Sequence, residues 1–291
     1  MSITRGYLYA LIAISGFATT FIGISLGNKG LDPIIMSAGR IIPAAIGALI
    51  ALKLSKQSLL PPRESRKWVA VLSLGIIIGF PMLSTFAMQS IPAADAGVIV
   101  AVAPLLTATF AILFGHRHPK RIFWLAAALG TVAAVIFALS RSHSPGGGEL
   151  WGYLLMIAAI TCSSLASVAG GLLAGRHNAF YVISWAILFA VPVLLPITAI
   201  DLAVHPITSW PEGSVWFGYL WVSLFSIFIG HYFWNSALSA LGVIRASQLQ
   251  LVQPLITMGL SVVILHELVS PVTLAAALAI IACVAWTQRI R

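Results

Sequence analysis

The sequence predicts an all-α integral membrane protein, with ten transmembrane helices in two inverted five-helix repeats around a central cavity. Three observations predict this fold: the composition, a series of long apolar runs, and a pattern that occurs twice along the chain. Of the 291 residues, 60% are hydrophobic and 8% are charged, against about 25% charged in an ordinary soluble domain. This composition excludes a soluble enzyme.

Ten apolar runs are each long enough to cross a bilayer, whose hydrocarbon core of about 30 Å needs about 20 helical residues. In chain order they are Gly6 to Gly27, Ile34 to Leu52, Trp68 to Met88, Ala96 to Gly115, Ile122 to Ser140, Leu150 to Gly175, Ala179 to Ile200, Val215 to Leu241, Ala246 to Leu265 and Leu268 to Gln288. The first run is longer than the roughly 7 to 15 residues of a signal-peptide core, so we expect a retained helix.

The net charge of +9 could suggest a protein that binds nucleic acid. Such proteins place their basic groups among other polar residues on a wetted face, whereas here the basic residues only separate apolar runs. We therefore expect a lipid bilayer and no nucleic acid as partner. Cys162 and Cys283 lie inside apolar runs and are interpreted as core residues.

The basic residues also predict the orientation, because Lys and Arg near helix ends stay on the cytoplasmic side. If the N-terminus is cytoplasmic, all of the 16 Lys and Arg residues lie in cytoplasmic segments except Lys29 and Arg141 outside and Arg40 within the second run. Both termini are therefore expected to be cytoplasmic, in the inner membrane of a bacterium.

A repeat is visible when residues 94 to 116 are aligned with residues 244 to 266. Pro104 aligns with Pro254, and the Leu that follows each proline is also shared. The opening of the first run, Gly6 with Tyr7 and Leu8, recurs as Gly152 with Tyr153 and Leu154 at the sixth. Five helices in each half force the second half to enter the membrane from the opposite side, so the repeat is expected to be inverted.

The charges agree with inversion. Asp95, expected outside, aligns with Arg245 inside, and Arg117, expected inside, aligns with Glu267 outside. The stretch from Ser142 to Gly148 is rich in glycine and is predicted to join the halves. The expected division is residues 1–141 for the first repeat, 142–148 for the linker and 149–291 for the second repeat.

Inverted repeats place a binding site near the membrane midplane, and rocking of the halves gives alternating access, so the pattern indicates a secondary transporter. The ten runs, the five-plus-five halves and the Pro-Leu segments at Pro104 and Pro254 resemble the EamA branch of the drug/metabolite transporter superfamily. Within it, the sequence is similar to bacterial inner-membrane exporters of amino acids, particularly aromatic ones. The resemblance implies a basket of helices whose cavity is formed mainly by the first, third, fourth, sixth, eighth and ninth.

Motifs for catalysis and for nucleotide binding are absent from the sequence: there is no P-loop, HExxH or GxSxG. We expect no enzyme activity, no cofactor and no metal. The acidic residues fall at helix ends or in loops, and the first run lacks the glutamate through which small multidrug exporters of this superfamily couple to protons. Carboxylate-based proton coupling is therefore not expected.

Two clusters are the main candidates for substrate binding. His231, Trp234 and Asn235 share one arc of the eighth run, where an aromatic ring beside an amide and an imidazole suits a substrate with apolar and polar ends. Gln250 and Gln253 share a face of the ninth run, and polar amides facing lipid are costly. The alternative roles are a buried neutral histidine bonded to a carbonyl, and interhelical hydrogen bonding by the glutamines.

Among the small hydroxyl residues of the first and sixth runs, Thr19 and Ser163 are further candidates for substrate binding. They bind substrate or, alternatively, let the helices pack closely. Pro104 and Pro254 interrupt the helical hydrogen bonds at matched points and are candidate hinges. Arg40 is costly inside the membrane, and it either snorkels to the outer interface, pairs with carbonyls or lines water in the transport pathway.

The predicted function is export of small metabolites, most simply neutral or aromatic amino acids, by alternating access. Lipophilic cations or drugs are the alternative substrates, although cation sites usually contain a buried carboxylate. A passive channel or an intramembrane enzyme is the alternative of another class. The partners expected are a small-molecule substrate and lipid, and the oligomeric state is left open, a monomer being compatible with this function.

Overall fold

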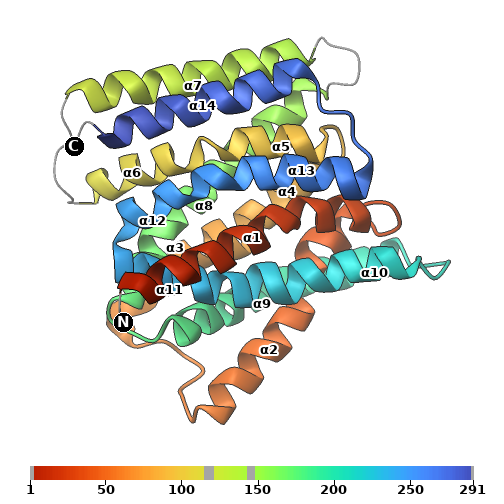
Figure 1. Cartoon of the computed structure of the whole chain (residues 1–291). Helices are drawn as coiled ribbons and strands as arrows, with labels where there is room; N and C mark the ends of the chain where they lie inside the picture. Colours follow the sequence, from red (N-terminus) through yellow and green to blue (C-terminus); the bar gives the residue numbers. More distant parts are fainter. Residues whose placement is uncertain (1–2, 115–120, 143–147, 290–291) are drawn as a thin grey trace.

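The computed structural model describes residues 3–114, 121–142 and 148–289, and these residues form helices with no strand among them (Figure 1). The first half contains α1 (Ile3–Gly27), η1 (Ile35–Gly39), α2 (Ile41–Leu54), η2 (Arg63–Ser65), α3 (Arg66–Leu72), η3 (Ser73–Gly79), α4 (Phe80–Ala87), α5 (Ala93–Val100), α6 (Ala103–Leu113) and α7 (Arg121–Ser142). The second half contains α8 (Leu150–Ala174), α9 (Ala179–Val204), α10 (Gly213–Leu220), η4 (Trp221–Gly230), α11 (His231–Leu241), α12 (Val243–Leu249), η5 (Gln250–Val252), α13 (Gln253–Leu265) and α14 (Pro271–Arg289). The all-α prediction is confirmed.

Some features of the sequence analysis lie outside the described residues. They include Arg117, positions 143–147 of the predicted linker, and the side chain of Cys283.

Eight helical segments are long and apolar enough to cross a bilayer, judged over the described residues. They are Ile3–Gly27, Ile35–Leu54, Arg63–Ala87, Ala93–Leu113, Leu150–Ala174, Ala179–Val204, Gly213–Leu241 and Val243–Leu265. The apolar stretches counted within α7 and α14 are shorter, at Val132–Ser142 and Pro271–Ala282. Ten spans therefore stay a prediction.

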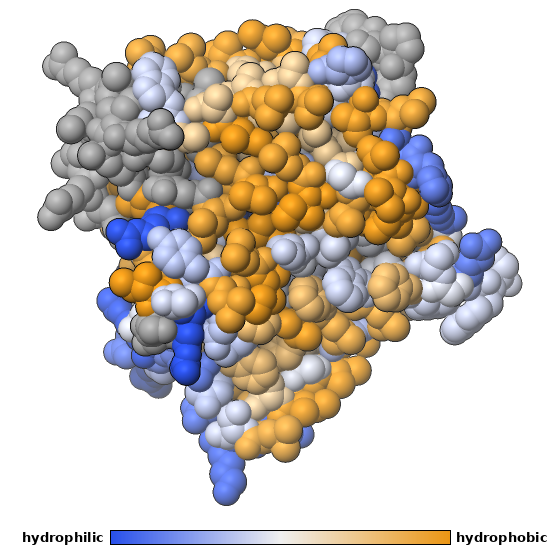
Figure 2. All heavy atoms as spheres, viewed as in Figure 1, coloured by the Kyte–Doolittle hydropathy of each residue, from blue (hydrophilic) through white to orange (hydrophobic). Residues whose placement is uncertain are grey.

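The outer surface between the two ends of the bundle is apolar. Hydrophobic side chains cover most of the middle of the face seen in Figure 2, and hydrophilic ones gather toward its left and right ends. Large side chains such as Ile46, Leu195 and Phe217 are exposed. A contiguous apolar surface of this kind is stable against lipid and not against water.

The helices are arranged around α1 and α8. Helix α7 packs against α14 at one edge of the molecule, and α2 packs against α9 at the opposite edge (Figure 1). Helix α1 packs against α11 and α13, while α8 packs against α4 and α6. The start of α1 and the end of α14 lie at the same end of the bundle, the left one in Figure 1.

In the third and eighth runs, and in the fourth and ninth, irregular segments interrupt the helices at corresponding places. The third run contains the π-helical segment η3, and the eighth contains the π-helical segment η4. In the fourth run α5 ends at Val100 and α6 begins at Ala103. In the ninth, α12 ends at Leu249 and the 3₁₀ segment η5 leads into α13 at Gln253. These irregular segments lie near the middle of the spans.

Arg40 is buried and bonded to backbone, so the snorkelling alternative is wrong. Its side chain is 1% exposed. Its guanidinium donates hydrogen bonds to the carbonyl oxygens of Ser37 (3.3 Å) and Pro81 (3.2 Å) and to Thr85 Oγ1 (2.9 Å). These bonds hold η1 against α4 and replace part of the hydration that the charge loses on burial.

A polar cluster at the start of α5 joins charges that the sequence analysis treated separately. Asp95 is 1% exposed and accepts hydrogen bonds from Arg141 Nε (2.9 Å), the Tyr153 hydroxyl (2.6 Å) and Thr273 Oγ1 (3.1 Å). Glu267 caps the same helix, because its two carboxylate oxygens accept from the backbone N–H groups of residues 93 and 94, each at 2.9 Å. This end of α5 is thus tied to α7, α8 and α14.

Candidate substrate cavity

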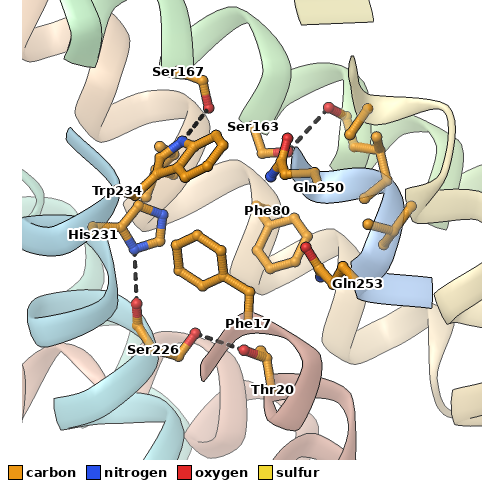
Figure 3. Close-up of a pocket in the computed structure, with 14 residues that line it drawn as sticks. Phe17, Thr20, Phe80, Ser163, Ser167, Ser226, His231, Trp234, Gln250 and Gln253 are labelled. Carbon is orange, nitrogen blue, oxygen red and sulfur yellow. Dashed lines mark hydrogen bonds between the residues drawn. The ribbon is translucent and has the colours of Figure 1, made fainter. Parts of the chain in front are cut away.

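A cavity lies where segments of the two halves meet (Figure 3), about two turns or more from the ends of α1 and α8. It is lined by Phe17, Thr20, Ile76, Phe80, Val100, Ala103, Ile160, Ser163, Ser167, Ser226, His231, Trp234, Gln250 and Gln253. These side chains come from the first, third, fourth, sixth, eighth and ninth runs, the six that the family resemblance implies. Within the described part of the chain, the lining contains no Asp, Glu, Lys or Arg.

One wall of the cavity is a chain of hydrogen bonds between α1, η4 and α11. Thr20 Oγ1 and Ser226 Oγ lie 2.8 Å apart, and His231 Nδ1 lies 2.7 Å from the carbonyl oxygen of Ser226 (Figure 3). A carbonyl only accepts, so His231 Nδ1 carries the proton. In the neutral ring, His231 Nε2 is then an acceptor.

Amide groups from η5 and α13 lie across the cavity from this wall (Figure 3). Gln253 is 4% exposed, and its Oε1 atom has no hydrogen-bond partner within the described structure. Gln250 is half-buried. Ser163 also lines the cavity, and its hydroxyl donates to the Ile160 carbonyl at 3.0 Å. A buried acceptor without a partner costs about 1–3 kcal/mol, so Gln253 favours a ligand or water that donates to it.

Aromatic rings supply the apolar part of the lining. The Phe17 ring centroid lies 4.7 Å from that of His231 and 6.1 Å from that of Trp234, the latter in an edge-to-face arrangement. Trp234 is 1% exposed and its Nε1–H donates to Ser167 Oγ at 3.4 Å. Phe80 also belongs to the lining (Figure 3). The cavity therefore offers ring faces next to uncharged hydrogen-bonding groups.

The cavity is small, with a volume of about 60 Å³. Sites for small ligands commonly have about 300–1,000 Å³. Side chains or helices must therefore move before a metabolite of amino-acid size can bind.

Five of the predicted binding residues line this cavity: His231, Trp234, Gln250, Gln253 and Ser163. Residues that are far apart in the sequence are thus brought together. Whether they bind substrate stays a prediction.

Thr19 does not line the cavity. Its hydroxyl donates to the Gly16 carbonyl at 2.6 Å and accepts from Trp221 Nε1 at 2.8 Å, on the outward side of the contact between α1 and η4. Thr20, its neighbour, faces the cavity instead. One residue turns a helix by about 100°, which separates the two hydroxyls.

Asn235 also lies outside the cavity, contrary to the expected arc with His231 and Trp234. It is completely buried where α11 contacts α8, with its amide oxygen against Gly170. One turn beyond His231 the same face of α11 packs against α8, so the Asn235 amide meets Gly170 and not the cavity. Both amide atoms lack hydrogen-bond partners within the described structure.

Both candidate hinge prolines lie directly after a break in their helix. Pro104 and Pro254 occupy the first turn of α6 and of α13, where the missing N–H of proline costs no helical hydrogen bond. The side chains of Val100, Ala103, Gln250 and Gln253 beside these breaks line the cavity. The hinge role itself stays a prediction.

Ser226 and Thr20 are cavity residues that the sequence analysis did not select. Ser226 lies within the π-helical segment η4. Its carbonyl contacts His231, five residues later, a spacing that a regular α-helix does not bring together. Thr20 could have been found only by knowing the rotation of α1. Neither signal is available from hydrophobic periodicity.

Apolar spans with a polar cavity at their centre define a multi-pass membrane transporter for small molecules. The EamA-like transporter family matches this chain twice, at residues 4–139 and 150–288. The chain therefore belongs to the EamA-like transporter family, as its resemblance indicated.

Several bacterial proteins are similar to it. The uncharacterized transporter YdeK of Bacillus subtilis is 32% identical over 290 residues, covering 98% of both chains. The uncharacterized inner membrane transporter YedA of Escherichia coli is 29% identical over 57% of this chain and 52% of its own. The pseudopaline exporter CntI of Pseudomonas aeruginosa is 24% identical over 60% of this chain and 63% of its own.

Another protein, whose crystal structure has been solved, has the same fold. It matches with a TM-score of 0.67 and 20% sequence identity, covering 99% of each chain.

Proposed function

We propose that this protein is a secondary transporter that exports small neutral metabolites, most simply neutral or aromatic amino acids, across a bacterial inner membrane by alternating access. The observation that carries the proposal is the chemistry of the cavity. It combines the rings of Phe17, Phe80 and Trp234 with the amide of Gln253 and the imidazole of His231, and its described lining is uncharged. A zwitterion with an aromatic side chain matches both surfaces.

The polar groups suit the two charged ends of an amino acid. Gln253 Oε1 and His231 Nε2 are acceptors for an ammonium group. The Gln250 amide can donate to a carboxylate, and so can the Ser163 hydroxyl once it rotates away from the Ile160 carbonyl. A zwitterion has no net charge, so its binding requires no buried counter-ion. This matches a lining without Asp or Arg among the described residues.

The proposed ten spans in two inverted repeats are supported by the matched irregular segments. The helical breaks before Pro104 and Pro254, and the π segments η3 and η4, fall at corresponding places in the two halves. The two family matches divide the chain between residues 139 and 150, in agreement with the proposed linker. Rocking about these segments would expose the cavity to each side in turn.

The proposed direction is outward, with both termini cytoplasmic. The distribution of Lys and Arg supports the orientation. CntI, a relative, is named as an exporter. The driving force in this proposal is the substrate gradient, because a zwitterion that moves without a coupled ion carries no net charge across the membrane.

Lipophilic cations are the second candidate substrate class. Trp234 and Phe17 present ring faces to which a cation can bind. A carboxylate at the cavity would be expected for this function, and the described lining contains none. A channel would need neither an inverted repeat nor paired hinges, and an enzyme would need an acid, base or metal cluster at membrane depth.

Counterflow tests the proposal. Purified protein in liposomes preloaded with unlabelled phenylalanine should accumulate labelled phenylalanine transiently, with no acceleration by an imposed pH gradient. Counterflow of a labelled lipophilic cation but of no amino acid would favour the second candidate. Strong acceleration by the pH gradient would contradict the proposed uncoupled mechanism and would direct attention to His231.

A further inference from the structure

We propose that a divalent transition-metal cation binds between Asp32, Asp201 and His205, outside the substrate cavity. Asp32 lies in the loop between α1 and η1, and the other two residues lie in the last turn of α9 and directly after it. One ligand atom from each of the three side chains lies within 4.8 Å of the other two. The site is at the end of the bundle where α1 ends, and it joins the two halves.

Asp201 is the observation that points to a missing cation. Its side chain is 3% exposed, and Oδ1 lies 3.1 Å from His205 Nδ1. Its other oxygen, Oδ2, is buried and has no hydrogen-bond partner within the described structure. A buried carboxylate oxygen without a partner is costly, and the Asp201 carboxylate faces the other two ligand groups.

The charge balance of the cluster points the same way. Two carboxylates converge, and the ion pairs described in this structure join Asp95 to Arg141 and Asp201 to His205. In the described part of the chain, neither Asp32 nor Asp201 forms an ion pair with Lys or Arg. A divalent cation balances the two carboxylates and supplies Asp201 Oδ2 with a partner.

The donor set selects the class of metal. Two carboxylate oxygens and one imidazole nitrogen suit Zn²⁺ or Mn²⁺, whereas Ca²⁺ and Mg²⁺ favour oxygen ligands alone. Three protein ligands leave the remaining positions for water. The ligand atoms of Asp201 and His205 already lie 3.1 Å apart, and bonds of about 2.0–2.2 Å to a tetrahedral Zn²⁺ require all three ligand atoms to surround one point. The His205 side chain is 63% exposed and can rotate.

Local structure already positions Asp32 for this role. Asp32 Oδ1 accepts a hydrogen bond from the Ile34 backbone N–H at 2.8 Å, which leaves Oδ2 for the cation. Segment η1 packs against α9, and Gly39 of η1 lies close to Thr198 of α9. A bound cation would therefore tie the start of the η1–α2 span to the end of α9 and would stabilise the folded state by linkage.

Zn²⁺ binding to the purified, tag-free protein in detergent tests the proposal, measured by calorimetric titration and by the melting temperature. We expect one Zn²⁺ per chain and a melting temperature that rises with Zn²⁺. Asp201→Asn and His205→Gln should each weaken binding at least tenfold. Glu212→Gln, which changes an exposed carboxylate in the loop before α10, is the matched control and should leave binding unchanged.

If Asp201→Asn fails to fold, His205→Gln still tests the proposal, because the exposed His205 side chain can be replaced without disturbing the core. Failure of the wild-type protein to bind Zn²⁺ or Mn²⁺ at 100-fold excess over protein would overturn the proposal. Equal Zn²⁺ binding by wild type and His205→Gln would also overturn it. Counterflow of amino acids is not needed for this measurement, so its outcome is independent of the proposed function.

Discussion

At the scale of single residues, Trp234 is one of the aromatic residues that line the cavity. Trp234→Ala should reduce the apparent affinity for aromatic substrates by roughly two- to tenfold, because ring contacts contribute about 0.5–1.5 kcal/mol. Small substrates such as alanine should be affected less. Transport kinetics with phenylalanine and alanine provide the comparison.

A fully buried tryptophan also stabilises the fold, so its replacement needs controls. Trp234→Phe retains a ring and should preserve most of the preference for aromatic substrates. Trp151→Ala removes a largely exposed tryptophan of α8 and should change neither affinity nor preference. A lowered melting temperature with unchanged substrate preference in Trp234→Ala would contradict the binding role.

Gln253 allows a sharper distinction, because its Oε1 atom has no partner in the described structure. Gln253→Ala should weaken substrate binding by roughly two- to tenfold, the loss of one hydrogen bond worth about 0.5–1.5 kcal/mol. The melting temperature should change little, since no described hydrogen bond is lost at Oε1. Gln89→Ala, at an exposed position, is the control.

A different result for Gln253→Ala would indicate that Gln253 forms hydrogen bonds between helices and does not bind substrate. Unchanged substrate affinity together with a clearly lower melting temperature would contradict its assignment to the binding site.

At this scale the sequence predicted the cavity residues that are unusual in an apolar run. It did not predict those whose position depends on the rotation of a helix about its axis. Glutamines and a histidine stand out inside apolar runs, and Gln250, Gln253 and His231 do line the cavity. Thr19 and Thr20 are chemically identical neighbours, so their sequence could not tell which one faces inward. The Ser226 contact depends on the π-helical segment η4, for which the sequence has no known signal.

At the scale of elements, the broken helices before Pro104 and Pro254 are the proposed moving parts. Pro104→Ala and Pro254→Ala would restore a backbone N–H and favour a more regular helix. We expect a several-fold lower maximum transport rate with little change in KM. Pro192→Ala, at an exposed site within α9, is the matched control. Wild-type rates in both hinge variants would contradict the proposed hinges.

The breaks themselves follow from the sequence, because proline disfavours the preceding turn of a helix. The polar cluster around Asp95 does not follow from it. Its members, Asp95, Arg141, Tyr153 and Thr273, belong to four different helices, and no local pattern relates them. Tertiary packing alone brings them together.

At the scale of the whole molecule, the orientation of the halves is testable by labelling. Asp95 is buried, so exposed positions are the better probes. Gln89→Cys and Arg245→Cys, in a Cys162→Ala and Cys283→Ala background, should react with a membrane-impermeant thiol reagent from opposite sides. The reagent is added to intact spheroplasts and to inverted vesicles. Reaction of both positions from the same side would contradict the inverted repeat.

The overall architecture was the most predictable level, because length and hydrophobicity directly determine which segments cross a bilayer. The helical class and the EamA family followed from the sequence, and the segments that line the cavity followed from the family resemblance. The small volume of the cavity and the cluster of Asp32, Asp201 and His205 did not. They depend on the distances between helices.

The central claim is that one central site is reached alternately from the two sides of the membrane, and a cysteine at the half-buried position Ser163 tests it most directly. In the same cysteine-free background, Ser163→Cys should react with the impermeant reagent from either side. Saturating substrate should slow both reactions severalfold. Reaction from one side only, or reaction that substrate does not affect, would contradict an alternating-access carrier with its binding site at this cavity.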